Sequence, residues 1–149
     1  PAPGDALSLD LNLLLSVMNR RIRYLLDRDH CVGHGYFMGC KSDVDVVRVF
    51  ARRVLPLLNE YFFGNESNLL LVVGDRLDGQ NNIFKIERRE EAFGQLFGID
   101  TDAASELGYR EHEAHVSISI DRRFWNPEQL IPGPEDHDFA VSALKKIYL

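Results

Sequence analysis

Apolar residues between positions 8 and 26 recur at the spacing of an α-helix, and this pattern constrains the fold more strongly than any other in the chain. The stripe consists of Leu11, Leu14, Leu15, Met18, Ile22, Leu25 and Leu26. Ser8 or Asp10 is suited to cap the start of the helix. We interpret Arg20, Arg21 and Arg23, which lie between the apolar positions, as a solvated face or a subunit contact. The pattern predicts a helix with one buried face.

A second apolar stripe covers residues 46–61. Ser42 and Asp45 precede it and resemble a capping box, with Asp in place of the usual Glu or Gln. Pro56 lies inside the stripe, where an interior proline costs about 3 kcal/mol. We therefore expect the helix to kink or to restart at this residue.

The remaining elements are shorter. We expect a helix over 66–73, a strand over 83–87, a short helix over 90–97, a strand over 115–120 and a closing helix over 139–148. Turns are expected at 75–82 and at Ile131-Pro132-Gly133-Pro134. The predicted fold class is α+β and mainly α: a helical bundle, then a small β element, then a C-terminal helix.

Length and composition fit one soluble globular domain over residues 1–149. We divide it into a helical core over 8–74 and a β-containing part over 75–149. The net charge of −6, from 17 basic and 23 acidic residues, disfavours a broad phosphate-binding surface, so we expect no direct DNA binding. No apolar run approaches the roughly 20 residues that span a bilayer, and we expect no membrane partner.

Cellular location is inferred from cysteine usage and from the first residues. Cys31 and Cys40 are too few for a disulfide framework, and no secretory leader precedes the first helix. Both observations favour a reducing cytoplasm. Because the chain begins Pro1-Ala2-Pro3-Gly4, we expect a processed product or a piece of a longer protein.

The stretch DRDHCVGHGYFMGC, residues 27–40, is the part of the chain that is richest in reactive side chains. A zinc site would use His30, Cys31, His34 and Cys40, but these lack the two separated ligand pairs that zinc motifs usually have. A thiol nucleophile at Cys31 would have only its sequence neighbour His30 as a base. The third interpretation is a tight turn, in which Gly33 and Gly35 take backbone angles closed to other residues and Tyr36 and Phe37 return to the core.

Several catalytic motifs are absent from the sequence. No GxxxxGK[ST] phosphate loop and no GxSxG nucleophile motif occurs. His112-Glu113-Ala114-His115 is one residue short of the HExxH spacing, which would place both imidazoles on one helical face. The sequence therefore offers no catalytic residue set of its own.

Two motifs in the first half of the chain resemble a known family. MNRRIRYLLDRDHCVGHGYF, residues 18–37, is similar to the segment after the ATPase core in AAA+ proteins of the McrB type, the motor subunits of methylcytosine-specific restriction systems. That pattern is approximately N-x-R-I, an apolar stretch, L-D-R-[DE]-H and G-H-S-Y-F, and Gly35 departs from it where serine is usual. VLPLLNEYFFGN, residues 54–65, resembles the following helix, which reads close to I-P-L-L-Q-E-Y-F-Y-G-D. The resemblance is strong over 18–74 and loose over 83–149.

The resemblance implies an AAA+ lid-like helical bundle that closes over nucleotide held by a separate core. It implies GTP or ATP with Mg²⁺ as cofactors of the intact parent protein, and no hydrolysis by this chain alone. Implied partners are the AAA+ core of the parent chain, the neighbours in a homo-oligomeric ring and an McrC-like nuclease subunit. We hypothesise that nucleotide or subunit state is sensed at the exposed turn, by Arg28, Gly33, His34, Gly35 and Tyr36. Residues expected to hold the motif are Asp27, Phe37, Pro56, Glu60 and Tyr61.

Two other classes of function stay open at this point. The chain could be a stand-alone interaction or adaptor domain with a lid-like fold, or a small zinc-binding module. A phosphate loop and an acidic Mg²⁺ motif upstream of Pro1 in the native reading frame would separate the lid from the adaptor. Elemental analysis of the pure chain would test the zinc module.

Overall fold

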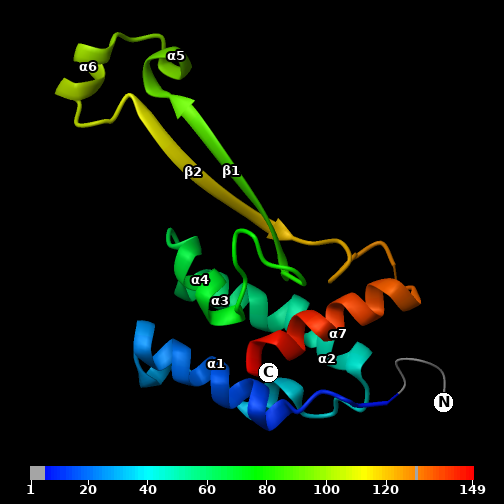
Figure 1. Cartoon of the computed structure of the whole chain (residues 1–149). Helices are drawn as coiled ribbons and strands as arrows, with labels where there is room; N and C mark the ends of the chain where they lie inside the picture. Colours follow the sequence, from blue (N-terminus) through cyan, green and yellow to red (C-terminus); the bar gives the residue numbers. More distant parts are fainter. Residues whose placement is uncertain (1–5, 130) are drawn as a thin grey trace. The chain divides into compact units, whose positions relative to one another are not determined.

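The structure, a computed structural model, describes residues 6–129 and 131–149, so position 130 and the first five residues of the predicted domain lie outside the described residues. The chain forms two compact units. The first combines residues up to Lys85 with residues from Ile120 onward, and the second is Ile86–Ser119. Helices dominate, and one two-stranded sheet accompanies them (Figure 1). The predicted α+β, mainly α fold class is confirmed.

Helix α1 (Leu11–Leu25) is the predicted amphipathic helix. The Asp10 carboxylate caps it by accepting a hydrogen bond from Leu13 N at 3.0 Å. The side chains that it buries are Leu14, Leu15, Met18 and Ile22. Helix α1 packs against α4 (Glu66–Val73) and α7 (Pro134–Tyr148) in the helical unit. The amide of Asp10 also donates a hydrogen bond to the Tyr148 hydroxyl at 3.1 Å, which ties the start of α1 to the end of α7.

The second apolar stripe is built as two helices rather than one. Helix α2 (Asp43–Val49) starts at Ser42, whose hydroxyl accepts a hydrogen bond from Asp45 N at 3.2 Å. A π-helical turn, Phe50–Val54, follows and leads into α3 (Leu55–Tyr61). Because Pro56 lies in the first turn of α3, its missing N–H costs no interior hydrogen bond. The backbone stays helical through this turn and the α-helix resumes at Leu55, so of the two predicted outcomes, a kink or a restart, the structure has a restart one residue before Pro56.

Both remaining helices of the helical unit occur where the sequence predicts them, but α7 begins earlier. Helix α4 ends at Gly74, whose φ of 74° is left-handed, as expected of a helix stop. Helix α7 begins at Pro134 and not at residue 139, so the predicted turn at Ile131–Pro134 is wrong at its last residue. Proline at the first helical position has a suitable φ and needs no N–H partner, so it starts this helix instead of preceding it.

The sheet consists of β1 (Phe84–Ala92) and β2 (His112–Ile120), with α5 (Phe93–Phe97) and α6 (Thr101–Glu106) between them in the chain. Both predicted strands exist, and both are longer than predicted. The predicted helix over 90–97 is wrong for residues 90–92, which belong to β1. Helix α6 was not predicted.

Backbone hydrogen bonds define the strand register. Phe93 N donates to Glu111 O at 2.6 Å, and Asp121 N donates to Ile83 O at 2.9 Å. Both bonds fit one antiparallel register without a bulge, because equal numbers of residues separate them along the two strands. This register places Glu91 directly opposite Glu113.

Candidate functional site

The turn after α1 is organised by Asp27. Its Oδ1 accepts hydrogen bonds from the amides of Asp29 (2.9 Å) and His30 (3.1 Å), and lies 2.6 Å from Nδ1 of His30. The hydrogen bond from His30 is the main cause that lowers the pKa of the Asp27 carboxyl. The His30 ring also meets the Tyr61 ring edge to face, with centroids 4.8 Å apart. Asp27 and Tyr61, both predicted to hold the motif, therefore belong to one cluster through His30.

Asn19 of α1 holds the part of the turn at Val32 by two hydrogen bonds. Its side-chain amide donates to Val32 O at 2.9 Å and accepts from Val32 N at 2.7 Å. Asn19 belongs to the quoted motif but was not predicted as a site residue. The signal available in the sequence was its spacing, four residues after Leu15 and three before Ile22, which puts the asparagine on the apolar face of the helix, where its amide requires hydrogen-bond partners.

The Gly-His-Gly segment forms a 3₁₀ turn, His34–Phe37, and not a turn that requires glycine. Gly33 has φ −82°, and the left-handed glycines do not include Gly35, so the predicted closed backbone angles are wrong at both positions. A Cβ added to Gly35 would meet no heavy atom within 4 Å. Phe37 is buried as predicted, whereas Tyr36 is only half-buried.

Three predicted residues line one shallow hollow of about 450 Å³: Tyr36, Pro56 and Glu60. Arg52 and Arg53 line it too, and the Arg53 guanidinium lies 5.4 Å from the centroid of the Tyr36 ring. Neither arginine is among the site residues predicted from the sequence. The sequence feature that could have indicated them is a pair of adjacent arginines between the apolar positions of the second stripe. The hollow combines two cations, an aromatic ring and one carboxylate, which suits a ligand or partner with negative charge.

Arg28 and His34 lie outside that hollow but are available to a partner. Both side chains are exposed, and neither makes a hydrogen bond or ion pair within the part of the chain that the structure describes. The structure thus brings Tyr36, Pro56 and Glu60 together and leaves Arg28 and His34 on the exposed turn.

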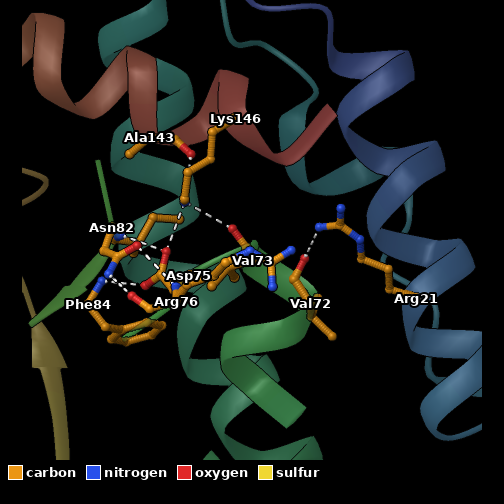
Figure 2. Close-up of polar contacts among 10 residues, drawn as sticks. Arg21, Val72, Val73, Asp75, Arg76, Asn82, Phe84, Ala143 and Lys146 are labelled. Atoms are coloured by element: carbon orange, nitrogen blue, oxygen red, sulfur yellow. Dashed lines mark hydrogen bonds and ion pairs between the residues drawn. The ribbon is translucent and has the colours of Figure 1, made fainter. Parts of the chain in front are cut away.

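A second polar cluster is centred on the buried carboxylate of Asp75 (Figure 2). It accepts hydrogen bonds from Ile83 N at 3.0 Å and Phe84 N at 2.8 Å, and lies 2.8 Å from Nζ of Lys146. Burial lowers the pKa of Lys146, and the Asp75 charge opposes that shift. Arg21 donates to Val72 O at 3.0 Å nearby. The cluster joins the end of α4, the start of β1 and α7.

The described residues do not form a zinc site. Among residues 6–129 and 131–149, no three His, Cys, Asp or Glu side chains gather as metal ligands, so His30, Cys31, His34 and Cys40 do not converge on a common point. The Cys31 thiol lies 3.8 Å from the carbonyl oxygen of Asn19. Burial is the main cause that raises the pKa of the Cys40 thiol, which opposes its activation as a nucleophile.

The helices over the described residues include none that is long and apolar enough to cross a bilayer. The α1–α4 region, with its exposed turn, is built of helices and helical turns. Residues 10–69 match the family model described as McrB, alpha-helical lid domain, so this segment, which is less than half of the chain, is similar to an McrB-type lid region. No curated protein matches the chain.

Proposed function

We propose that the chain is the lid of an McrB-like AAA+ NTPase, where it closes the nucleotide pocket and contributes to ring assembly in a DNA-restriction motor. The match of residues 10–69 to the McrB lid model carries this proposal. The nucleotide, GTP or ATP with Mg²⁺, would be held by the core of the parent protein. The lid supplies residues that face this core or a ring neighbour. An McrC-like nuclease would be engaged through the parent in the cytoplasm, without direct DNA contact by the lid.

The exposed turn is the part of the lid proposed to sense nucleotide or subunit state. Arg28 and His34 are free of partners within the described residues, so a phosphate or a neighbouring carboxylate can pair with them at little cost. Gly35 leaves open space where a side chain would stand, which permits close approach of another backbone or a ligand. Hydrogen bonds to Asp27 and Asn19 hold the turn in one conformation, so a ligand that binds there loses little free energy in ordering it.

The Arg52–Arg53 hollow offers a second contact for the same role. Its cations lie beside Tyr36, at the end of the exposed turn. A negatively charged edge of the core or of a ring neighbour would contact both features at once. We therefore propose the turn and the hollow as one continuous contact surface.

The proposal is tested in the complete parent protein. We expect its reading frame to carry a phosphate loop and an acidic Mg²⁺ motif before residue 1, and we expect His34→Ala to lower nucleotide turnover by about tenfold or more, or to weaken ring assembly. His112→Ala, an exposed histidine of β2, serves as the matched control. Unchanged turnover together with unchanged assembly in His34→Ala would reject the sensing role. A reading frame without those motifs would favour the adaptor domain.

A further inference from the structure

Almost all of the net negative charge lies in the second unit. Ile86–Ser119 contains eight acidic and three basic residues, a net charge of −5 within a chain of net charge −6. The helical unit is thus nearly neutral overall, although its arginines are clustered. The second unit is therefore acidic as a whole, whereas positive charge in the helical unit is confined to local arginine clusters.

The acidic unit presents two unpaired carboxylates on one face of its sheet. Glu91 and Glu113 stand directly opposite each other in the register set by the bond from Phe93 N to Glu111 O. Side chains opposite each other in a pair of strands have Cβ atoms about 5 Å apart, and like charges there are destabilising. Both are exposed, and neither takes part in an ion pair within the described residues. A cation brought to this face would relieve their repulsion.

Apolar side chains surround this carboxylate pair. Glu91 and Glu113 line a hollow of about 460 Å³ together with Phe93, Leu96, Phe97, Tyr109, Arg110 and His115. Leu96 is 59% exposed, Phe97 62% and Tyr109 55%. Large apolar side chains left in water beside charged side chains, here two carboxylates and Arg110, are typical of a protein-binding surface. We name Glu91, Glu113, Leu96, Phe97 and Tyr109 the acidic face.

The helical unit carries a surface of the opposite character. A groove of about 880 Å³ is lined by four arginines, by Val17, Tyr24, Leu25, Leu71 and Gly74, and by Asp75. We name it the arginine groove after Arg20, Arg21, Arg23 and Arg76. Asp75, the one carboxylate among the described residues that line it, is already paired with Lys146. Tyr24, at 90% exposed, and Leu71, at 50%, supply apolar area next to the cations.

The cations of the groove lack neutralising partners. Arg20 and Arg23 are three residues apart on α1, so they share a face of the helix, and neither makes an ion pair in the described part of the chain. Arg21 has its pKa lowered, first by burial and then by the charge of Arg76. The groove therefore suits an acidic surface with apolar side chains, which is the composition of the acidic face.

We propose that the acidic face of one copy docks on the arginine groove of a second copy. The contact is head-to-tail, because two different surfaces meet, and repeated contacts of this kind generate rings or filaments. It gives the ring-assembly part of the proposed function a contact surface, and it rests on that function only for its biological setting. Charge complementarity across the contact sets the register and suppresses wrong partners.

The test uses charge reversal in the full 149-residue chain, followed by sedimentation velocity from about 10 μM to 1 mM, the usual range of weak association. We expect the unchanged chain to self-associate, and to do so less at high salt. Arg20→Glu with Arg23→Glu should weaken association at least tenfold, and so should Glu91→Lys with Glu113→Lys. Combining all four substitutions in one chain should restore association, because the signs are then exchanged.

Matched controls carry the same charge change away from the contact. Glu90→Lys with Glu106→Lys alters two residues of the second unit that do not line the acidic face, and Lys41→Glu with Arg122→Glu alters exposed residues outside the groove. Both should associate like the unchanged chain. Circular dichroism of each variant verifies that its helices are retained.

Three outcomes would overturn the proposal. One is a monomer at every concentration, and another is association that survives both reversed pairs. The third is a four-substitution chain that stays monomeric although it is folded. Binding of a DNA duplex that depends on Arg20 and Arg23, with no self-association, would assign the groove to nucleic acid instead. This assay contains no nucleotide, so a negative result would not count against the proposed closure of the nucleotide pocket by the lid. In the same way, a His34→Ala variant with unchanged turnover and assembly would not count against the contact between copies.

Discussion

Nζ of Lys146 in α7 lies 2.8 Å from Oδ1 of Asp75, whose side chain is fully buried at the end of α4. The same lysine donates to Val73 O at 3.1 Å and to Ala143 O at 3.2 Å, and the same carboxylate receives two amides from the start of β1. A buried ion pair in which the remaining donors and acceptors are also satisfied holds three elements together. The two residues are far apart in the sequence, so the pair closes the helical unit.

Asp75→Ala should lower the free energy of unfolding by about 3–5 kcal/mol, because it leaves a largely buried ammonium and two buried amides without their acceptor. Urea unfolding followed by circular dichroism measures this cost. Asp78→Ala, an exposed aspartate in the same loop, should cost less than about 0.5 kcal/mol. A loss below about 1 kcal/mol in Asp75→Ala would show that the pair does not hold the unit together.

Asp43, the first residue of α2, should behave in the same way. Its buried carboxylate accepts from Ser8 N (2.9 Å), Ser8 Oγ (2.6 Å) and Leu9 N (3.1 Å). We expect Asp43→Ala to cost about 2–4 kcal/mol, because hydrogen bonds to a buried charge are worth more than neutral ones. Asp29→Ala on the exposed turn is the control for urea unfolding. Equal effects of the two substitutions would contradict this anchoring role.

The turn at Asp27 should depend on pH in a defined direction. The hydrogen bond from His30 lowers the pKa of Asp27 below its ordinary 3.8, so the folded state favours the carboxylate. The resulting stabilisation is present above the unfolded value and is lost as the pH falls through the lower folded pKa. Carbon-detected NMR titration of the Asp27 carboxyl measures this pKa. His30→Ala should raise it, whereas His34→Ala should leave it unchanged; no difference between the two variants would contradict the assignment.

Two glycines should respond differently to alanine. A Cβ at Gly94 would lie 2.5 Å from Ile99 O, so Gly94→Ala forces the backbone after α5 to shift. We expect it to destabilise the second unit by about 1–3 kcal/mol, as overpacking commonly does. Gly35→Ala meets open space and should change stability by less than about 0.5 kcal/mol. Hydrogen exchange of β1 and β2 measures the first effect and urea unfolding the second. The prediction would be contradicted if hydrogen exchange of β1 and β2 became faster in Gly35→Ala but not in Gly94→Ala.

The helices of the helical unit could be predicted because the information that forms them is local. The apolar stripe of α1 and the proline restart at α3 are visible in short windows of sequence, and the structure has both. The end of β1 could not be predicted in this way. Residues 90–92 carry two glutamates and an alanine, which favour helix, and they become strand because β2 pairs with them. Tertiary pairing overrides local preference there.

The sequence was sufficient to predict which segment forms the candidate site, but not which side chains contact one another there. The sequence drew attention to residues 27–40, and the structure puts an ordered turn with exposed polar groups there. The contact of Asn19 with Val32 and that of Arg53 with Tyr36 join residues from different elements. Spacing alone does not reveal such contacts. The glycine angles were wrongly predicted because a 3₁₀ turn satisfies the same composition with ordinary backbone angles.

The packing of α1 on α7 has a consequence for biosynthesis. A ribosome releases α1 before α7, and the helix that covers part of the apolar stripe of α1 is translated only after everything between Leu25 and Pro134. During that interval the nascent lid exposes leucine and methionine side chains, the condition under which chaperones bind and aggregation begins. A fragment cut to residues 10–69 would keep every residue that matches the McrB lid model and still lack this cover.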